Sequence, residues 1–185
     1  RDSVLVTDGI YFMETPSGWG DWDSTPDRAR NTPIVSASGA RYRYQPAAPF
    51  RDGSGGRQHE NTLADIAMYY WLNDLVPDSA GEVGKNDVPT SGRDPAFWQH
   101  MRTYTISFGE GASLNTSAPP GMPGAQRDSW LTPNGNDVSA GMEAVWHAAV
   151  NGHGQFFSSS NGDELGRALK TILDEANPGK GPGST

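Results

Sequence analysis

The residue best placed for chemistry in this sequence is an aspartate that directly follows a short apolar run. Residues 3–6 read Ser-Val-Leu-Val, and Thr7, Asp8 and Gly9 come next. This pattern predicts a buried parallel strand that ends at the glycine. Because parallel sheets bind ligands at the carboxyl ends of their strands, the Asp8 carboxylate can coordinate Mg²⁺ or Ca²⁺, which prefer oxygen ligands. The alternative is that Asp8 only caps the turn.

A second group of carboxylates lies in a loop that also contains tryptophan. Asp21, Asp23 and Asp27 are close together in the sequence, and such a loop can hold Ca²⁺. The loop does not match an EF-hand, because no glycine and glutamate follow at the required spacing. We therefore expect a solvated acidic loop at this position.

The four histidines form no recognisable metal-binding pattern. His147 and His153 are too far apart for one helix face, and Gly152 breaks the helix between them. His59 and His100 stand alone. Since no His-Glu-x-x-His or His-x-His pairing occurs, we expect no zinc site and interpret His147 as a packed or capping residue near a helix end.

Motifs for hydrolysis and nucleotide binding are absent from the sequence, which contains no Gly-x-Ser-x-Gly, no Walker A sequence and no complete dinucleotide loop. A hydrolase built on an α/β sheet remains the alternative. It would need a nucleophile and a base within hydrogen-bond reach, and no fixed spacing of Ser, Asp and His indicates one. We therefore expect a protein that is not an enzyme.

The composition limits the number of domains and the classes of function that remain. A chain of 185 residues is the size of one domain, and its 23 glycines and 14 prolines predict long loops. The net charge of −8 argues against nucleic-acid binding, and no apolar run approaches the roughly 20 residues of a membrane span. Without cysteine there are no disulfides. The chain starts at Arg1, and we expect any targeting segment to lie upstream.

Strands alternate with helices along the chain, which predicts an α/β fold with a parallel sheet of about three core strands. The domain should span residues 1–178, with long insertions at about 14–57 and 111–136 and a disordered tail at 179–185. A β-hairpin over residues 34–44 turns at Ser38 and Gly39. The core strands are expected at 3–6, 102–108 and 155–158, and the helices at 61–75, 137–150 and 162–176, with Asp137 as the N-cap of the second helix.

Aromatic side chains are concentrated in the loops and insertions. Loop aromatics are common in recognition surfaces, but they also pin long loops to the body of a domain. Both interpretations stay open here. The candidates for binding loops are Trp19, Trp22, Tyr42, Tyr44, Trp98 and Trp130.

Four segments resemble the PilY/PilC family of type IV pilus tip adhesins and biogenesis factors. They are VLVTDG at 4–9, NTLADIAMYYW at 61–71, DPAFWQHM at 94–101 and VWHAAVNGHGQFF at 145–157. The resemblance implies the C-terminal half of a von Willebrand factor A-like domain in a larger secreted protein. It covers most of the chain up to about residue 176.

The resemblance also implies a function and partners. Such proteins lie at the pilus tip or the outer-membrane surface of Gram-negative bacteria, where they support surface attachment and pilus biogenesis. Expected partners are minor pilins or the pilus tip and a host-cell or abiotic surface ligand, with no nucleic acid and no membrane span. The alternative is a structural scaffold that primes pilus assembly through minor-pilin contacts.

In the resembling family, the von Willebrand metal site combines an Asp-x-Ser-x-Ser loop, a distant threonine and an aspartate after the fourth strand. Only the last maps onto this chain, at Asp8. We therefore expect Mg²⁺ or Ca²⁺ at Asp8 only in an intact domain that supplies upstream residues, and no cofactor in this chain alone. The missing N-terminal half is then a further partner, and the edge at Val4–Val6 should be exposed or paired with another chain.

Overall fold

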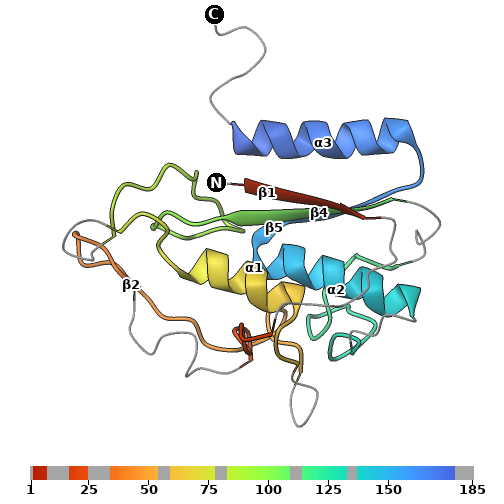
Figure 1. Cartoon of the computed structure of the whole chain (residues 1–185), viewed down its shortest axis with the longest axis horizontal. Coiled ribbons are helices and arrows are strands. Elements are labelled where there is room, and N and C mark those ends of the chain that lie inside the picture. Colours follow the sequence, from red (N-terminus) through yellow and green to blue (C-terminus); the bar gives the residue numbers. More distant parts are fainter. Residues whose placement is uncertain are drawn as a thin grey trace, which may run out of the picture.

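A three-stranded parallel sheet with helices on both faces forms the body of the chain in a computed structural model (Figure 1). The structure describes residues 2–7, 17–24, 34–53, 59–77, 83–108, 114–132 and 137–177. The predicted disordered tail at 179–185 lies outside these ranges.

The sheet has the order β1-β4-β5, with every neighbouring pair parallel. Strand β1 spans Asp2–Thr7, β4 spans Arg102–Phe108 and β5 spans His153–Ser159. The central strand β4 is buried along almost its whole length, as expected for a parallel strand that is covered on both faces. The predicted α/β class and parallel sheet are therefore confirmed.

Strand β5 begins two residues earlier than its pattern predicts, because two glycines let it approach β4 closely. His153 pairs with Thr103, and Gly154 follows within the strand. A Cβ atom on Gly154 would lie 2.1 Å from the carbonyl oxygen of Thr103, and one on Gly152 would lie 2.4 Å from Thr103 Cβ. Only glycine fits so close to a neighbouring backbone.

Three helices flank the sheet, and the caps set where they begin. Helix α1 (Leu63–Leu72) is shorter than predicted, because Thr62 and Asp65 form a capping box and Asn73 is extended. Helix α2 (Val138–Asn151) begins after the predicted cap Asp137, whose side chain accepts hydrogen bonds from two backbone N–H groups. Helix α3 spans Gly162–Ala176 as predicted.

Helix α3 covers one face of the sheet, whereas α1 and α2 cover the other (Figure 1). Ala168 and Ile172 are the buried residues of α3, and they pack against Tyr104 and Ile106 of β4. Because α3 is otherwise exposed, its single apolar stripe docks it on the sheet.

A second, aromatic core lies on the side of α1. Met68 and Trp71 of α1 pack with Trp98 and Tyr44, and the Trp98 Nε1–H donates to the Trp71 carbonyl oxygen at 2.6 Å. The predicted hairpin is present as strands β2 (Ile34–Val35) and β3 (Arg41–Tyr42), which pair antiparallel. Tyr42 contacts both tryptophan rings, so the aromatic core holds the hairpin to the domain.

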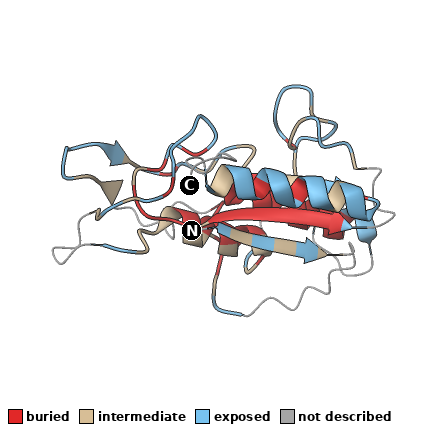
Figure 2. Ribbon diagram, turned by 90° about the horizontal axis from the view of Figure 1, so that it is seen from above, coloured by how far each residue is buried: buried red, intermediate tan, exposed pale blue. Residues whose placement is uncertain are grey.

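Strand β1 forms an open edge of the sheet, as predicted. Val4 and Val6 are 44% and 49% exposed, and α3 lies over β4 and leaves β1 uncovered (Figure 2). An ion pair between Asp2 and Arg102 at 2.7 Å fastens the start of β1 to β4. Among the described residues no other strand pairs with the outer side of β1, and this edge exposes apolar side chains.

The close approach at Gly154 can be tested with a matched pair of alanine substitutions. Gly154→Ala should lower the free energy of unfolding by about 2 kcal/mol or more, because the new methyl group meets a backbone carbonyl. Gly166→Ala, in an exposed part of α3 with open space around it, should raise it by roughly 0.5–1 kcal/mol. Urea denaturation of both variants measures the difference, and equal midpoints would contradict the packing.

Candidate metal centre in a buried carboxylate cluster

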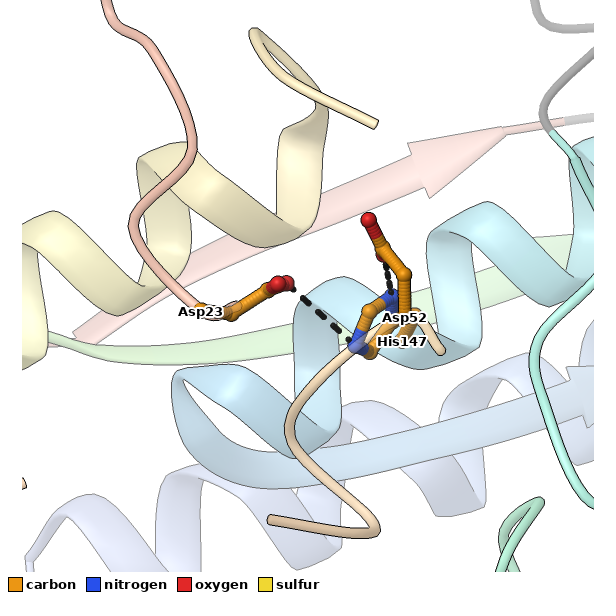
Figure 3. Close-up of side chains that lie close together, drawn as sticks. All are labelled: Asp23, Asp52 and His147. Carbon is orange, nitrogen blue, oxygen red and sulfur yellow. Dashed lines mark ion pairs between the residues drawn. The ribbon is translucent and has the colours of Figure 1, made fainter. Parts of the chain in front are cut away.

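Three ionisable side chains from distant parts of the sequence meet beside helix α2. Asp23, Asp52 and His147 each offer one ligand atom, and these atoms all lie within 4.8 Å of one another (Figure 3). All three side chains are buried. We call these residues the carboxylate–histidine cluster.

The loop over residues 17–24 is positioned by the start of α1. Asn61 Oδ1 accepts hydrogen bonds from the backbone N–H groups of Gly18 at 3.1 Å and Gly20 at 2.8 Å. Asp65 Oδ1 accepts one from the Trp22 N–H at 2.6 Å, while Asp65 Oδ2 accepts two from Thr62. The side chain of Asp65 therefore both caps the helix and holds the loop, while Asn61 holds the loop alone.

Asp23 is held rigidly by neutral donors. Its Oδ1 accepts a hydrogen bond from Ser24 Oγ at 2.7 Å, and its Oδ2 accepts one from Asn151 Nδ2 at 2.8 Å. Its backbone carbonyl accepts a third, from the Tyr44 hydroxyl at 2.6 Å. None of these donors carries a charge, so the carboxylate is fixed in place without being neutralised.

His147 lies between two carboxylates, and each ring nitrogen faces one of them (Figure 3). Nδ1 is 3.4 Å from Asp52 Oδ1, and Nε2 is 3.6 Å from Asp23 Oδ2. Nε2 also lies 2.5 Å from the Phe50 carbonyl oxygen, to which its N–H donates. The ring stacks on Trp130 with a centroid separation of 4.3 Å.

The acidic loop is buried, which corrects the expectation that it is solvated. Asp21 and Asp23 are both buried, and with Asp65 they form a second group whose ligand atoms lie within 4.8 Å of one another. The expectation failed because a tertiary contact, the docking of this loop on α1, supplies N–H donors that sequence spacing cannot show. Asp27 lies outside the described residues.

Burial and mutual repulsion shift the pKa values of this region. Burial raises the pKa of Asp23 well above its ordinary value, and the carboxylates of Asp52 and Asp65 add to this shift. Burial also raises the pKa of Asp52 to about 7 and that of Asp65 to about 6. The pKa of His147 is lowered to about 3 by burial, so its imidazole is neutral near pH 7.

Two kinds of chemistry fit such a cluster. Among the residues that the structure describes, neither Asp23 nor Asp52 pairs with a lysine or an arginine. Buried carboxylates in this position either hold a proton or bind a cation. The oxygen and imidazole donors are also ligands for divalent metal ions.

The predicted binding-loop aromatics all make packing contacts, and three of them are removed from the surface. Tyr44, Trp98 and Trp130 are buried, because they fill the space between the loops and the helices. The half-buried rings of Trp19 and Trp22 pack edge-on against Tyr69 of α1, and Tyr42 is described above. Asp8, the metal ligand predicted from its position after a strand, lies outside the described residues.

A further buried histidine–aspartate pair supports the aromatic core. His100 Nε2 contacts Asp94 Oδ2 at 2.8 Å, and Nδ1 contacts the Trp98 carbonyl oxygen at 2.7 Å. The other oxygen of Asp94 accepts the Trp71 Nε1–H at 3.0 Å. Both ring nitrogens of His100 are therefore engaged, which leaves neither to activate a nucleophile.

Sequence reasoning did not find the carboxylate–histidine cluster. His147 was expected to be packed near a helix end, and it is buried in the last turns of α2. Its partners Asp23 and Asp52 come from two separate loop segments, so no spacing pattern joins them. The one available signal was the Asp-x-Asp pair at Asp21 and Asp23, which matched no known loop.

Fold and cluster together define an α/β domain with a parallel sheet, whose long loops enclose a group of buried carboxylates around a histidine. The chain is 34% identical over 191 residues to the type IV pilus biogenesis factor PilY1 of Pseudomonas aeruginosa strain PAO1. It is 34% identical to PilY1 of strain PAK and 28% identical to PilY1 of strain UCBPP-PA14, in each case over 92% of this chain. The predicted resemblance is confirmed, because the chain matches one region of the type IV pilus biogenesis factor PilY1 over most of its own length.

The match covers only part of these relatives. The chain spans 15% of their length. No family model and no solved structure matches the chain, so its von Willebrand factor A-like character stays a prediction. None of the described helices is long and apolar enough to cross a membrane.

Replacing Asp52 by asparagine should stabilise the metal-free chain. Because the folded-state pKa is raised from 3.8 to about 7, the fold binds a proton that the unfolded chain has lost between these values. Asp52 therefore lowers stability as the pH rises through this window, and the loss is complete above pH 7. The asparagine side chain keeps an oxygen for the His59 N–H and can donate to His147 Nδ1.

We expect the gain in free energy of unfolding to be about 1–3 kcal/mol at pH 8 and close to zero at pH 4. Thermal melts in EDTA at both pH values measure it. Asp87→Asn, at an exposed aspartate, is the matched control and should change neither melt. If Asp52→Asn instead lowers the stability at pH 8, the Asp52 carboxylate does not destabilise the fold when it is ionised.

Proposed function

We propose that this chain is an extracellular interaction module of a type IV pilus factor that supports surface attachment and pilus biogenesis. The observation that carries the proposal is the similarity to PilY1 pilus biogenesis factors over 92% of the chain. The net charge of −8 argues against nucleic acid as the partner of this module. Its place would be the pilus tip or the outer-membrane surface.

The open edge of the sheet is the surface best suited to this role. Val4 and Val6 are exposed on β1, the strand that α3 leaves uncovered, and Leu173 of α3 is also exposed. Val4 pairs in register with Tyr104, whose side chain is fully buried under α3. An added strand beside β1 would therefore extend both the hydrogen-bond ladder and the apolar layer.

We propose that the strand beside β1 comes from another part of the longer protein. The chain spans only 15% of the PilY1 relatives, so most of their length lies outside the matched region. This completed edge would join the module to the remainder of the factor. The loops that lie away from the β1 edge would then face pilins or a surface ligand.

Placing a charged side chain on strand β1 tests, in the bacterium that carries the sequence, whether this edge supports attachment and pilus biogenesis. Val6→Asp should reduce surface attachment and twitching several-fold, because a charge on the edge opposes strand addition. Val138→Asp is the matched control, since Val138 is 50% exposed and Val6 is 49% exposed. An aspartate at the first turn of α2 is compatible with the helix.

The number of surface pili separates attachment from assembly. Lost attachment with normal piliation supports the adhesion role, whereas reduced piliation supports the alternative of a scaffold that primes assembly. Thermal melting of the purified Val6→Asp chain shows whether the fold is retained. If this variant and Val138→Asp behave alike in every assay, the edge is not the working surface.

A further inference from the structure

We propose that the side of α3 next to β1 binds an amphipathic helix from the remainder of the longer protein. The inference rests on the proposed function, because it takes β1 to be completed by another part of that protein. It goes further by naming a second element, a helix, and the face of the sheet on which this helix lies. We call its binding surface the α3–β1 flank, which comprises the exposed residues Val4, Val6, Gly166, Leu169 and Leu173.

The apolar arc of α3 is wider than the part that the sheet covers. Successive residues of an α-helix are turned by about 100° around its axis. Measured from Ile172, Ala168 lies at about −40° and Gly166 at about +120°. Between these two positions every residue of α3 is glycine, alanine, leucine or isoleucine, and every charged residue lies on the remaining arc. Only Ala168 and Ile172 are buried, so much of the apolar arc is left for another contact.

The contacts of Glu175 show which side of α3 lies next to β1. Glu175 and Leu173 lie about 60° and 100° from Ile172, in opposite directions around the helix. The Glu175 carboxylate accepts a hydrogen bond from Arg93 at 3.4 Å, and Arg93 also donates to the Gln155 side chain of β5 at 3.1 Å. The side of α3 that carries Glu175 therefore lies toward β5, and the side that carries Leu173 lies toward β1.

The exposed valines of β1 point to the same face of the sheet as α3. Val4 pairs with Tyr104 and Val6 pairs with Ile106, and paired residues of neighbouring parallel strands share one face. Tyr104 and Ile106 pack beneath α3, so Val4 and Val6 also point to the α3 face. This face therefore presents apolar side chains from β1 and from the adjoining side of α3 (Figure 2).

A helix is the element that fits the α3–β1 flank. The layer that covers a face of a parallel sheet consists of helices, and α3 already forms part of that layer over β4. A second helix beside α3 would bury Val4 and Val6 below it and Leu169 and Leu173 at its side. A Cβ atom on Gly166 would meet nothing within 4 Å, so α3 has no bulky side chain there to hold a neighbour away.

The topology of the sheet places such a helix on the α3 face. Helices α1 and α2 lie on the other face, as right-handed crossovers that run in the direction from β1 to β5 require (Figure 1). A right-handed crossover that leads outward from a strand added beside β1 runs in the reverse direction and therefore lies on the α3 face. The chain spans 15% of the PilY1 relatives, so a longer protein of this kind has ample length to supply both elements.

Thiol labelling of the complete protein, purified from the bacterium that carries the sequence, tests the docking. The chain contains no cysteine, so Leu173→Cys places a thiol on the flank. Lys170→Cys is the matched control, because the Lys170 side chain is 75% exposed on the charged arc of the same helix. In the complete protein, Leu173→Cys should react with a maleimide about tenfold more slowly than Lys170→Cys, because the docked helix must first open. In the isolated chain the two rates should agree, and mass spectrometry of the labelled peptides measures both.

Hydrogen exchange of the β1 amides in the complete protein separates this inference from the proposed function. Slow exchange in β1 with equal labelling of the two variants means that a strand is added without a helix, which overturns the inference alone. Fast exchange with equal labelling overturns both. Protection of Leu173→Cys that is lost on dilution assigns the flank to another copy or another protein, and overturns the assignment to the same chain. If Leu173→Cys does not fold, Leu169→Cys on the same arc gives the same readout.

Discussion

Carboxylates that are removed from water join the long loops of this chain to its helices. Asp65 caps α1 and, through the Trp22 N–H, holds the loop over residues 17–24 against it. Asp23 in that loop then reaches Asn151 of α2. A buried carboxylate must find donors or a cation, and this requirement fixes segments that have little regular structure of their own. The loops are long, but their positions are specified.

The buried aspartates differ in how well their environment satisfies them. Asp65 accepts three hydrogen bonds, and Asp94 is bonded to His100 and Trp71. Burial acts to raise the pKa of Asp94, but these bonds outweigh it and the pKa is lowered. Among the described residues, the Asp52 carboxylate accepts one hydrogen bond, from the His59 N–H, and lies beside the ring of His147. The structural aspartates are thus satisfied within the protein, whereas the cluster at Asp52 retains capacity for a ligand.

The regular elements could be predicted because their signals are local. The period of apolar residues placed β4 and α3 at their observed bounds, and Asp137 was recognised as the cap of α2. The ends of α1 and β5 were displaced, because a capping box shortens the first and a close glycine contact extends the second. The start of α1 is displaced by a contact between Thr62 and Asp65 within the predicted helix. The start of β5 is displaced by a contact of its glycines with Thr103 of β4, a different element.

The site could not be predicted to the same extent, because its members are brought together only by folding. The sequence by itself determined the alternation of strands and helices, the open β1 edge and the relation to pilus biogenesis factors, since these depend on residue order alone. Tertiary structure decided which aspartates are buried and which loop aromatics become core. It also decided that His147 faces Asp23 and Asp52. The physical reason is that burial and ligand geometry are properties of the packed chain, in which residues far apart in sequence share a small volume without water.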